Sequence, residues 1–436
     1  MYLTPYTVLP SGLDSMDPLG FLRPYAALTD ALLPEFTTVT VAPACHSFLC
    51  WAVRFLSRRH LSVKDREFAR SMRDLEVLWG VLCLRASRPE GVLNITKLNR
   101  LPQKKPTRAV ARKAEFGLYA NPGYGVRGHY AGPSVTWGFL DADMNLTSSG
   151  EALAEAWDTR LPPNGRRGRK RPTFTTLAEA WMNDEPVPDA ALNEEDCLCW
   201  SVAEGVPNER EKFVWKRAFS RAAELWPAGR GLWTQPPDAK VKALYAANRF
   251  AFFPALRLHY EARNSAGRFD ELLRCLERCR AFEQFAALVQ FIFEWEYLRR
   301  QRQGSEEPLP PHRLTGKVLR RAAREAADSL EGSGLGWDLP SRLCLDDSFE
   351  TQVSVIIAAH TAHQKRKLAQ PFMDEHTVLL TDRVQNSPVM RLAEKLADAD
   401  ETRLCRGVMN AYPRSWFFNN VWRWLDYAGE SHGHAD

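Results

Sequence analysis

Apolar residues recur every three or four positions along most of this chain, and that spacing constrains the fold more than any other feature. The clearest run contains Phe68, Met72, Leu75, Trp79 and Leu82. These positions fall on one face of a helix with 3.6 residues per turn. Ser62 precedes the run as an N-cap, and Asp65 follows in the first turn. The sequence therefore predicts an amphipathic helix over residues 62–82.

Similar spacing predicts further helices in both halves of the chain. They cover residues 23–33, 44–59, 209–226, 240–263, 268–302, 313–330, 348–368 and 389–412. Pro254 lies inside one of them and predicts a kink, because proline lacks the N–H that the helical ladder needs. The fold class is therefore predicted as mainly α.

Residues 135–157 show a different local pattern. A short apolar run is followed by a turn at Asp141 and Asp143, and Thr147 or Ser148 can cap the helix that begins next. This order resembles part of a winged-helix domain. The matching residues are Gly138, Phe139, Leu140, Leu146, Thr147, Gly150, Leu153 and Ala154. The resemblance implies a winged-helix-like α+β module in the N-terminal region.

Three short stretches together resemble accessory proteins of prokaryotic defence or mobile-element islands. They are residues 12–21, 130–133 and 138–157. This resemblance implies a subunit of a bacterial, anti-phage complex that binds nucleic acid and partner proteins.

The 436 residues are enough for two or three domains. Pro162-Pro163-Asn164-Gly165 and the arginines after it have the composition of a linker. We predict a helical and winged-helix-like domain at 1–160, a basic linker at 161–188, a larger α-helical domain at 189–430 and a disordered tail at 431–436.

The net charge of +5 is too small to indicate nucleic-acid binding by itself, but the cations are clustered. The first cluster is Lys97, Arg100, Lys104, Lys105, Arg108, Arg112 and Lys113. The second is Arg160, Arg166, Arg167, Arg169, Lys170 and Arg171. The clusters flank the winged-helix-like region, so they predict phosphate contacts with double-stranded DNA. The alternative is an ordinary solvated linker.

We find no complete catalytic motif, so the predicted role is non-catalytic and requires no cofactor. Residues 123–128 satisfy the GxGxxG spacing of dinucleotide-binding proteins. Pro122 and Pro133 argue against a helix opening there, so we expect a Gly-rich turn or a β-hairpin connection instead.

The best candidate metal ligands are His360 and His363, three residues apart on a predicted helix, with Asp374 nearby. They support an alternative function as a metal-dependent nuclease or phosphoesterase. A further alternative is a structural scaffold that makes no contact with nucleic acid.

Aromatic residues are concentrated near the C-terminus. Trp416, Phe417, Trp422 and Trp424 are of the types enriched at protein interfaces, so they are the predicted partner-binding residues, with core packing as the alternative. The chain has neither a secretory signal nor an apolar stretch of about 18 residues, which predicts a cytoplasmic protein without membrane contact.

Overall fold

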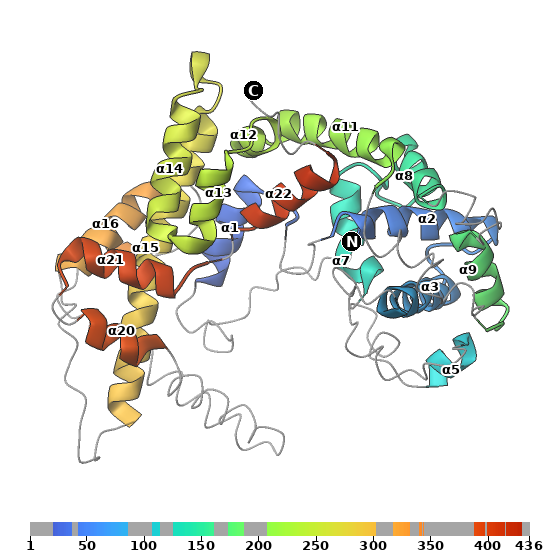
Figure 1. Cartoon of the computed structure of the whole chain (residues 1–436), viewed down its shortest axis with the longest axis horizontal. Coiled ribbons are helices and arrows are strands. Elements are labelled where there is room, and N and C mark those ends of the chain that lie inside the picture. The colour runs from blue at the N-terminus through green and yellow to red at the C-terminus, as the bar shows by residue number, and fades with distance from the viewer. Residues whose placement is uncertain are drawn as a thin grey trace. The chain divides into compact units, whose positions relative to one another are not determined.

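The structure is a computed structural model, and it shows a protein built from helices (Figure 1). It describes residues 21–36, 42–85, 107–113, 125–160, 173–186, 207–301, 317–331, 340–341, 343, 388–396, 399–414 and 416–429. The predicted mainly α class is confirmed. Across these ranges the only β-type pairing is an isolated antiparallel bridge between Leu140 and Leu146.

The chain forms two compact units, and each contains segments from distant parts of the sequence. Unit 1 comprises Met1–Leu3, Glu35–Leu225 and Phe417–Asp436, and unit 2 comprises Thr4–Pro34 and Trp226–Trp416. The predicted linker at 161–188 falls inside unit 1, where part of it forms helix α9.

Unit 1 is assembled around α2. Its helices are α2 (Ala44–Arg58), α3 (Arg66–Arg85), α5 (Arg108–Lys113), α7 (Val126–Thr136), α8 (Ser148–Asp158), α9 (Phe174–Met182), α11 (Glu209–Leu225) and α22 (Phe418–Tyr427). α2 is apolar on nearly all sides, so it is buried from Ala44 to Val53, and it packs on α3, α7 and α8 (Figure 1). Phe48, Trp51, Trp79 and Trp157 form the aromatic core beside it, with Phe48 and Trp79 stacked at 4.6 Å between ring centroids.

Unit 2 is assembled around α15, the longest of its helices. Its elements are α1 (Leu22–Leu32), η2 (Pro227–Gly229), α12 (Arg230–Thr234), α13 (Ala239–Ala247), α14 (Arg249–Glu261), η3 (Ser265–Gly267), α15 (Asp270–Gln301), α16 (Lys317–Leu330), α20 (Pro388–Leu396) and α21 (Glu401–Ala411). α15 packs on α1, α14, α16, α20 and α21. Residues 281–289 of α15 are buried throughout, which explains why apolar residues surround this part of the helix instead of forming one stripe.

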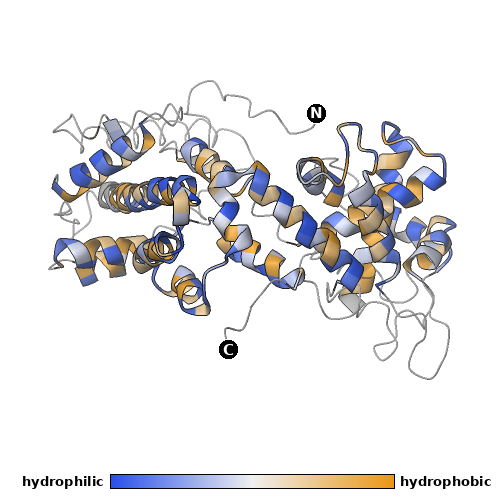
Figure 2. Cartoon of the chain, turned by 90° about the horizontal axis from the view of Figure 1, so that it is seen from above, coloured by the Kyte–Doolittle hydropathy of each residue, from blue (hydrophilic) through white to orange (hydrophobic). Residues whose placement is uncertain are grey.

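Most helices carry hydrophobic and hydrophilic residues on opposite sides, as the hydropathy colours in Figure 2 show. The predicted helices at 23–33, 44–59, 209–226, 268–302 and 313–330 correspond closely to α1, α2, α11, α15 and α16. The predicted helix at 348–368 and tail at 431–436 lie outside the described residues.

The structure does not support the predicted winged-helix-like module, because the described residues contain no sheet. The stretch from 135 to 157 is instead the end of α7, a tight turn and α8. Asp141 forms that turn by accepting hydrogen bonds from the backbone N–H groups of Asp143 (2.9 Å) and Asn145 (2.8 Å). The predicted cap is confirmed, since Thr147 Oγ1 accepts from Gly150 N at 3.1 Å.

Other boundaries differ from the predictions for local reasons. The helix predicted at 62 begins at Arg66, because Ser62 and Asp65 close a separate turn through Ser62 N and Asp65 Oδ2 (3.1 Å). Pro254 lies inside α14 without ending it, and the break falls at Asn248, which separates α13 from α14. The segment predicted at 389–412 is likewise two helices, with Asp400 capping the second.

Candidate nucleic-acid interface

The turn between α2 and α3 carries five exposed cations, Arg58, Arg59, Lys64, Arg66 and Arg70, which we call the basic corner. α2 ends at Arg58, and His60 follows in a left-handed conformation (φ 60°) that reverses the chain direction. The first exposed turn of α3 then places Arg66 and Arg70 four residues apart, on the same side of the helix. Helix ends and a short turn therefore bring cations from 13 residues of sequence to one place.

Most of these cations have no acidic partner within the described part of the chain. Arg58, Arg66 and Arg70 form no ion pair there, and Arg59 lies over the Phe55 ring at 5.7 Å. Lys64 Nζ is 3.7 Å from Asp143 Oδ1, but both side chains are more than 70% exposed (82% and 74%). An exposed pair of this kind contributes little to stability, so a polyanion can replace it readily.

The end of the first predicted cluster is fixed against α3 by α5. Arg112 donates to both carboxylate oxygens of buried Asp74, through Nε to Oδ1 at 3.0 Å and through Nη2 to Oδ2. Ala109 N donates to Asp184 Oδ1 at 2.7 Å, which ties the other side of α5 to the end of α9. Arg112 is therefore an anchor with its hydrogen-bonding capacity in use, while Arg108 is half-buried with no ion pair in the described residues.

The anchor places α5 next to the basic corner. Glu67 Oε1 also lies 3.9 Å from Arg112 Nη2, so both Glu67 and Asp74 mark the face of α3 that α5 covers. Arg70 lies between them in sequence and is exposed at the border of that face. Lys97, Arg100, Lys104 and Lys105 lie outside the described residues, as does the Lys113 side chain.

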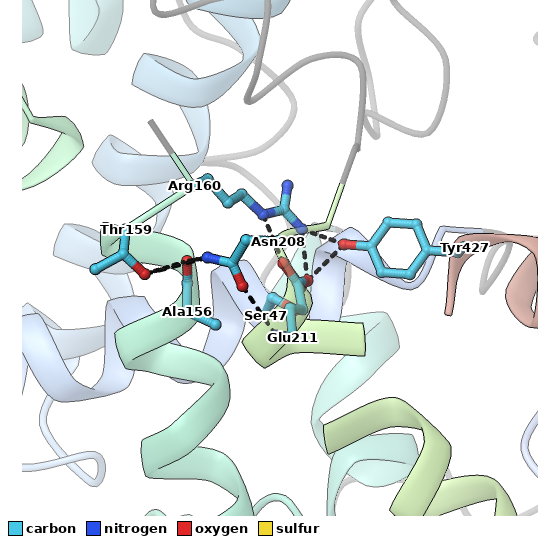
Figure 3. Close-up of polar contacts among 7 residues, drawn as sticks. All are labelled: Ser47, Ala156, Thr159, Arg160, Asn208, Glu211 and Tyr427. Carbon is cyan, nitrogen blue, oxygen red and sulfur yellow. Dashed lines mark hydrogen bonds and ion pairs between the residues drawn. The ribbon is translucent and has the colours of Figure 1, made fainter. Parts of the chain in front are cut away.

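The second predicted cluster is described only at Arg160, and there the prediction is wrong. Arg160 and Glu211 are both fully buried as side chains, and they form a bidentate pair with Nε–Oε2 at 2.8 Å and Nη2–Oε1 at 2.6 Å (Figure 3). Arg160 cannot contact phosphate in this position. Arg166, Arg167, Arg169, Lys170 and Arg171 lie outside the described residues.

The same buried cluster contains residue types that are used in catalysis. Ser47 Oγ and Tyr427 Oη both donate to Glu211 Oε1 at 2.5 Å, and Arg160 Nη2 also donates to Tyr427 Oη (Figure 3). Asn208 Oδ1 accepts from Glu211 N at 2.9 Å and caps the start of α11. Each hydroxyl and carboxylate therefore has an internal partner, and the cluster joins α2, α8, α11 and α22.

A second buried pair, His46 and Ser134, also has a structural role. His46 Nδ1 is 2.8 Å from Ser134 Oγ, and both residues have no exposed surface. Tyr130, Phe139, Trp215 and Trp424 surround the imidazole edge-on at 5.0–5.8 Å between centroids. Burial lowers the pKa of His46 to about 3, so the ring is neutral and cannot act as a proton carrier near neutral pH.

The GxGxxG segment opens a helix, contrary to the predicted turn or hairpin. Gly125 (φ 107°) precedes α7, and Glu76 from α3 accepts a hydrogen bond from Val126 N at the helix start. A Cβ on Gly125 would lie 2.5 Å from Glu76 Oε2, so glycine is required there. The carboxylate occupies the place where a dinucleotide phosphate would bind, which excludes a phosphate at this helix start.

Comparisons with protein-family models, curated proteins and solved structures found no match. The interface is therefore argued from its own residues. Within the described ranges no group of three or more His, Cys, Asp or Glu side chains could hold a metal ion, and none of the helices is long and apolar enough to cross a membrane. The alternative metal ligands His360, His363 and Asp374 lie outside those ranges.

The four predicted partner-binding aromatic residues lie in the interior. Trp416 is fully buried in unit 2, where its Nε1 donates to Glu283 Oε2 at 2.6 Å. Trp424 is 1% exposed in unit 1 and packs on Phe36 at 4.5 Å. Phe417 and Trp422 are each 6% exposed. Core packing, the alternative interpretation of these residues, accounts for their positions.

The basic corner was missed because its cations are not consecutive. Asp65 and Glu67 interrupt the run, and the composition of residues 58–70 is therefore less distinctive than that of 97–113. The usable signal was the pair of predicted helices at 44–59 and 62–82, since the turn between them had to expose whatever charges it contained.

Proposed function

We propose that this chain is a non-catalytic subunit that binds double-stranded DNA through the basic corner and the basic segment that leads into α5. The observation that carries the proposal is the set of five exposed cations at the α2–α3 turn, of which three have no ion pair in the described residues. Arginine suits this task because its guanidinium binds phosphate oxygens in bidentate fashion.

The spacing of the cations matches a phosphate backbone. Arg66 and Arg70 are separated by about 6 Å along the axis of α3, since a helix rises 1.5 Å per residue. Successive phosphates of one DNA strand are separated by about 3.4 Å along the duplex axis. Two arginines on one helix face can therefore engage neighbouring or alternate phosphates, with Arg58 and Arg59 on the flanking turn.

Contacts of this type position a protein on DNA without reading its sequence. The basic corner offers charge but no exposed Asn or Gln that could recognise a base edge. We therefore assign the interface to sequence-independent binding. The resemblance to anti-phage accessory proteins loses its winged-helix part with the missing sheet, so the proposal extends to DNA binding only.

The support for a non-catalytic role comes from the buried polar clusters of unit 1. Glu211, Ser47 and Tyr427 satisfy one another, and His46 is held neutral in an aromatic environment. These are the groups in unit 1 best suited to acid–base or nucleophilic chemistry, and each serves packing instead.

The test is the salt dependence of duplex binding by the full chain. Each phosphate contact contributes a slope of about 0.9 in a plot of log binding constant against log salt. Replacing Arg58, Arg59, Arg66 and Arg70 together by alanine should weaken binding to a fluorescent DNA duplex and reduce the slope by about three to four units. Replacing Lys104, Lys105 and Arg108 should reduce it further.

The matched control removes four exposed cations from unit 2, Lys240, Arg263, Arg268 and Arg274, and changes the net charge equally. Its slope should remain that of the wild type. Equal losses in the two quadruple variants would show that net charge alone drives binding and would remove the basic corner as the site. An unchanged slope in the corner variant would do the same.

A further inference from the structure

Two of the three large apolar side chains that the described residues expose lie on one helix, α11. Phe213 is 59% exposed and Leu225 is 52% exposed. The opposite face of α11 is buried through Val214, Trp215, Ala218, Phe219 and Ala222. The buried face anchors the helix in unit 1, so Phe213 and Leu225 are presented from a fixed support.

The exposed residues of α11 form a ridge of the kind that helices use to pack on each other. Phe213, Arg217, Arg221 and Leu225 follow at steps of four, which defines one continuous ridge with an apolar residue at each end. It spans 12 residues, or about 18 Å of helix. Lys216, Ser220 and Glu224 form the adjacent ridge, and small Ser220 leaves the groove between them shallowest to fill at its centre.

The middle of the ridge is cationic and held in place. The Arg217 guanidinium lies 5.8 Å from the centre of the Phe213 ring, a cation–π contact that stiffens both side chains. Arg221 lies against the turn before α8, since a Cβ on Gly138 would meet its Nη1 at 2.3 Å. Neither arginine has an ion pair in the described part of the chain. The ridge therefore reads apolar, positive, positive, apolar.

We infer that the outer ridge of α11 is a docking site for an acidic amphipathic helix of a partner protein. Charge complementarity selects this occupant: Asp or Glu at the centre of the partner helix would pair with Arg217 and Arg221, while aliphatic residues at its ends would cover Phe213 and Leu225. The ridge of a helix packs into the groove of another at an angle near −50°, so about three turns of partner helix would be in contact.

Two other occupants fit less well. A second copy of this chain would bring the same arginines of both copies together, and like charges in contact are unfavourable. Nucleic acid would satisfy the arginines and could stack on Phe213, but it would leave aliphatic Leu225 without a partner. The inference stands apart from DNA binding, because α11 shares no residue with the basic corner.

The test uses the full chain and a synthetic probe peptide with leucine on one helical face and glutamate on the other. A second peptide carries lysine in place of glutamate, and a third has the glutamate peptide's composition with the leucines spread around the helix. We expect the wild-type chain to bind the glutamate peptide at least about tenfold more tightly than the other two, a difference of about 1.4 kcal/mol.

Variants of the ridge identify the site. Phe213→Ser with Leu225→Ser should weaken the glutamate peptide about tenfold, and Arg217→Glu with Arg221→Glu should reverse the preference toward the lysine peptide. Lys240→Glu with Arg263→Glu in unit 2 is the matched charge control and should change nothing. Thermal unfolding of each variant checks the fold, since the altered side chains are exposed.

Three outcomes would overturn the inference. One is equal binding of all three peptides, and another is wild-type binding by both ridge variants. The third is loss of duplex DNA binding on changing Phe213 and Leu225, which would make α11 a nucleic-acid surface. Loss of DNA binding in the basic-corner variant with peptide binding intact would leave the inference standing by itself.

Discussion

Glu283 is a buried carboxyl whose protonation links the stability of unit 2 to pH. It accepts hydrogen bonds from Trp416 Nε1 (2.6 Å) and Arg414 N (3.0 Å), and Arg249 Nε lies 3.8 Å away. The hydroxyl-bearing rings of Tyr25 and Tyr245 complete its charged and titratable surroundings. Burial raises its pKa from 4.5 to about 7, because removal from water disfavours the ionised form more than these partners favour it.

The folded state therefore binds this proton more tightly than the unfolded state. The resulting stabilisation is fully present below pH 4.5 and is lost as the pH rises toward 7, an effect of about 3 kcal/mol. Glu283→Gln keeps the shape without the titration. In urea unfolding at pH 5 and pH 8, the variant should lose part of the pH dependence that the wild type shows, whereas Glu331→Gln on the surface should keep all of it. Identical pH dependence in the three proteins would contradict the assignment.

The junction between α13 and α14 shows, at the scale of elements, how a local hydrogen bond outweighs a helix-breaking residue. Asn248 N donates to Leu244 O at 2.8 Å and ends α13, while Asn248 Oδ1 accepts from Ala251 N at 3.2 Å and begins α14. Pro254 is exposed five residues into α14, where only one backbone hydrogen bond is lost.

Replacing the cap should therefore cost stability. Asn248→Ala should lower the free energy of unfolding by about 1 kcal/mol, because Ala251 N loses its acceptor. Asn248→Asp retains a carboxylate oxygen there and should keep most of the wild-type stability. The measurement is the urea midpoint of the full chain. A larger loss from Asn248→Asp than from Asn248→Ala would show that the residue does not act as a cap.

Long apolar periodicity could be predicted from the sequence, and capping geometry could not. α2, α11 and α15 were identified because their apolar spacing is uninterrupted for several turns. α7 was missed because it contains two glycines and Pro133, and its start is fixed by Glu76, which lies 50 residues away. The same limit applies to the interface: clustered charges are visible in the sequence, but burial of Arg160 by Glu211 depends on a tertiary contact.

The whole molecule interleaves its two units, and α22 is the element that shows the consequence. Unit 1 takes its first helices from residues 35–225 and its last from the C-terminal 20 residues. Trp424 of α22 packs on Trp215 at 5.1 Å and on His46 at 5.3 Å between centroids, and Tyr427 reaches the Arg160–Glu211 pair. The core of unit 1 is therefore completed by residues nearly 400 positions from its first helix, an arrangement of high contact order.

Removing the Trp424 ring should destabilise unit 1 as a deletion in any core does. Trp424→Ala should cost about 3–5 kcal/mol and expose α2 and α11 to limited proteolysis, because the ring is 1% exposed and leaves a cavity among His46, Trp137 and Trp215. Arg423→Ala changes the exposed neighbour on α22 and serves as the control, with wild-type stability expected. Cleavage mapped by mass spectrometry should appear in unit 1 before unit 2. Equal resistance of the two variants would mean that unit 1 closes without α22, and that the interleaved topology carries no energetic weight.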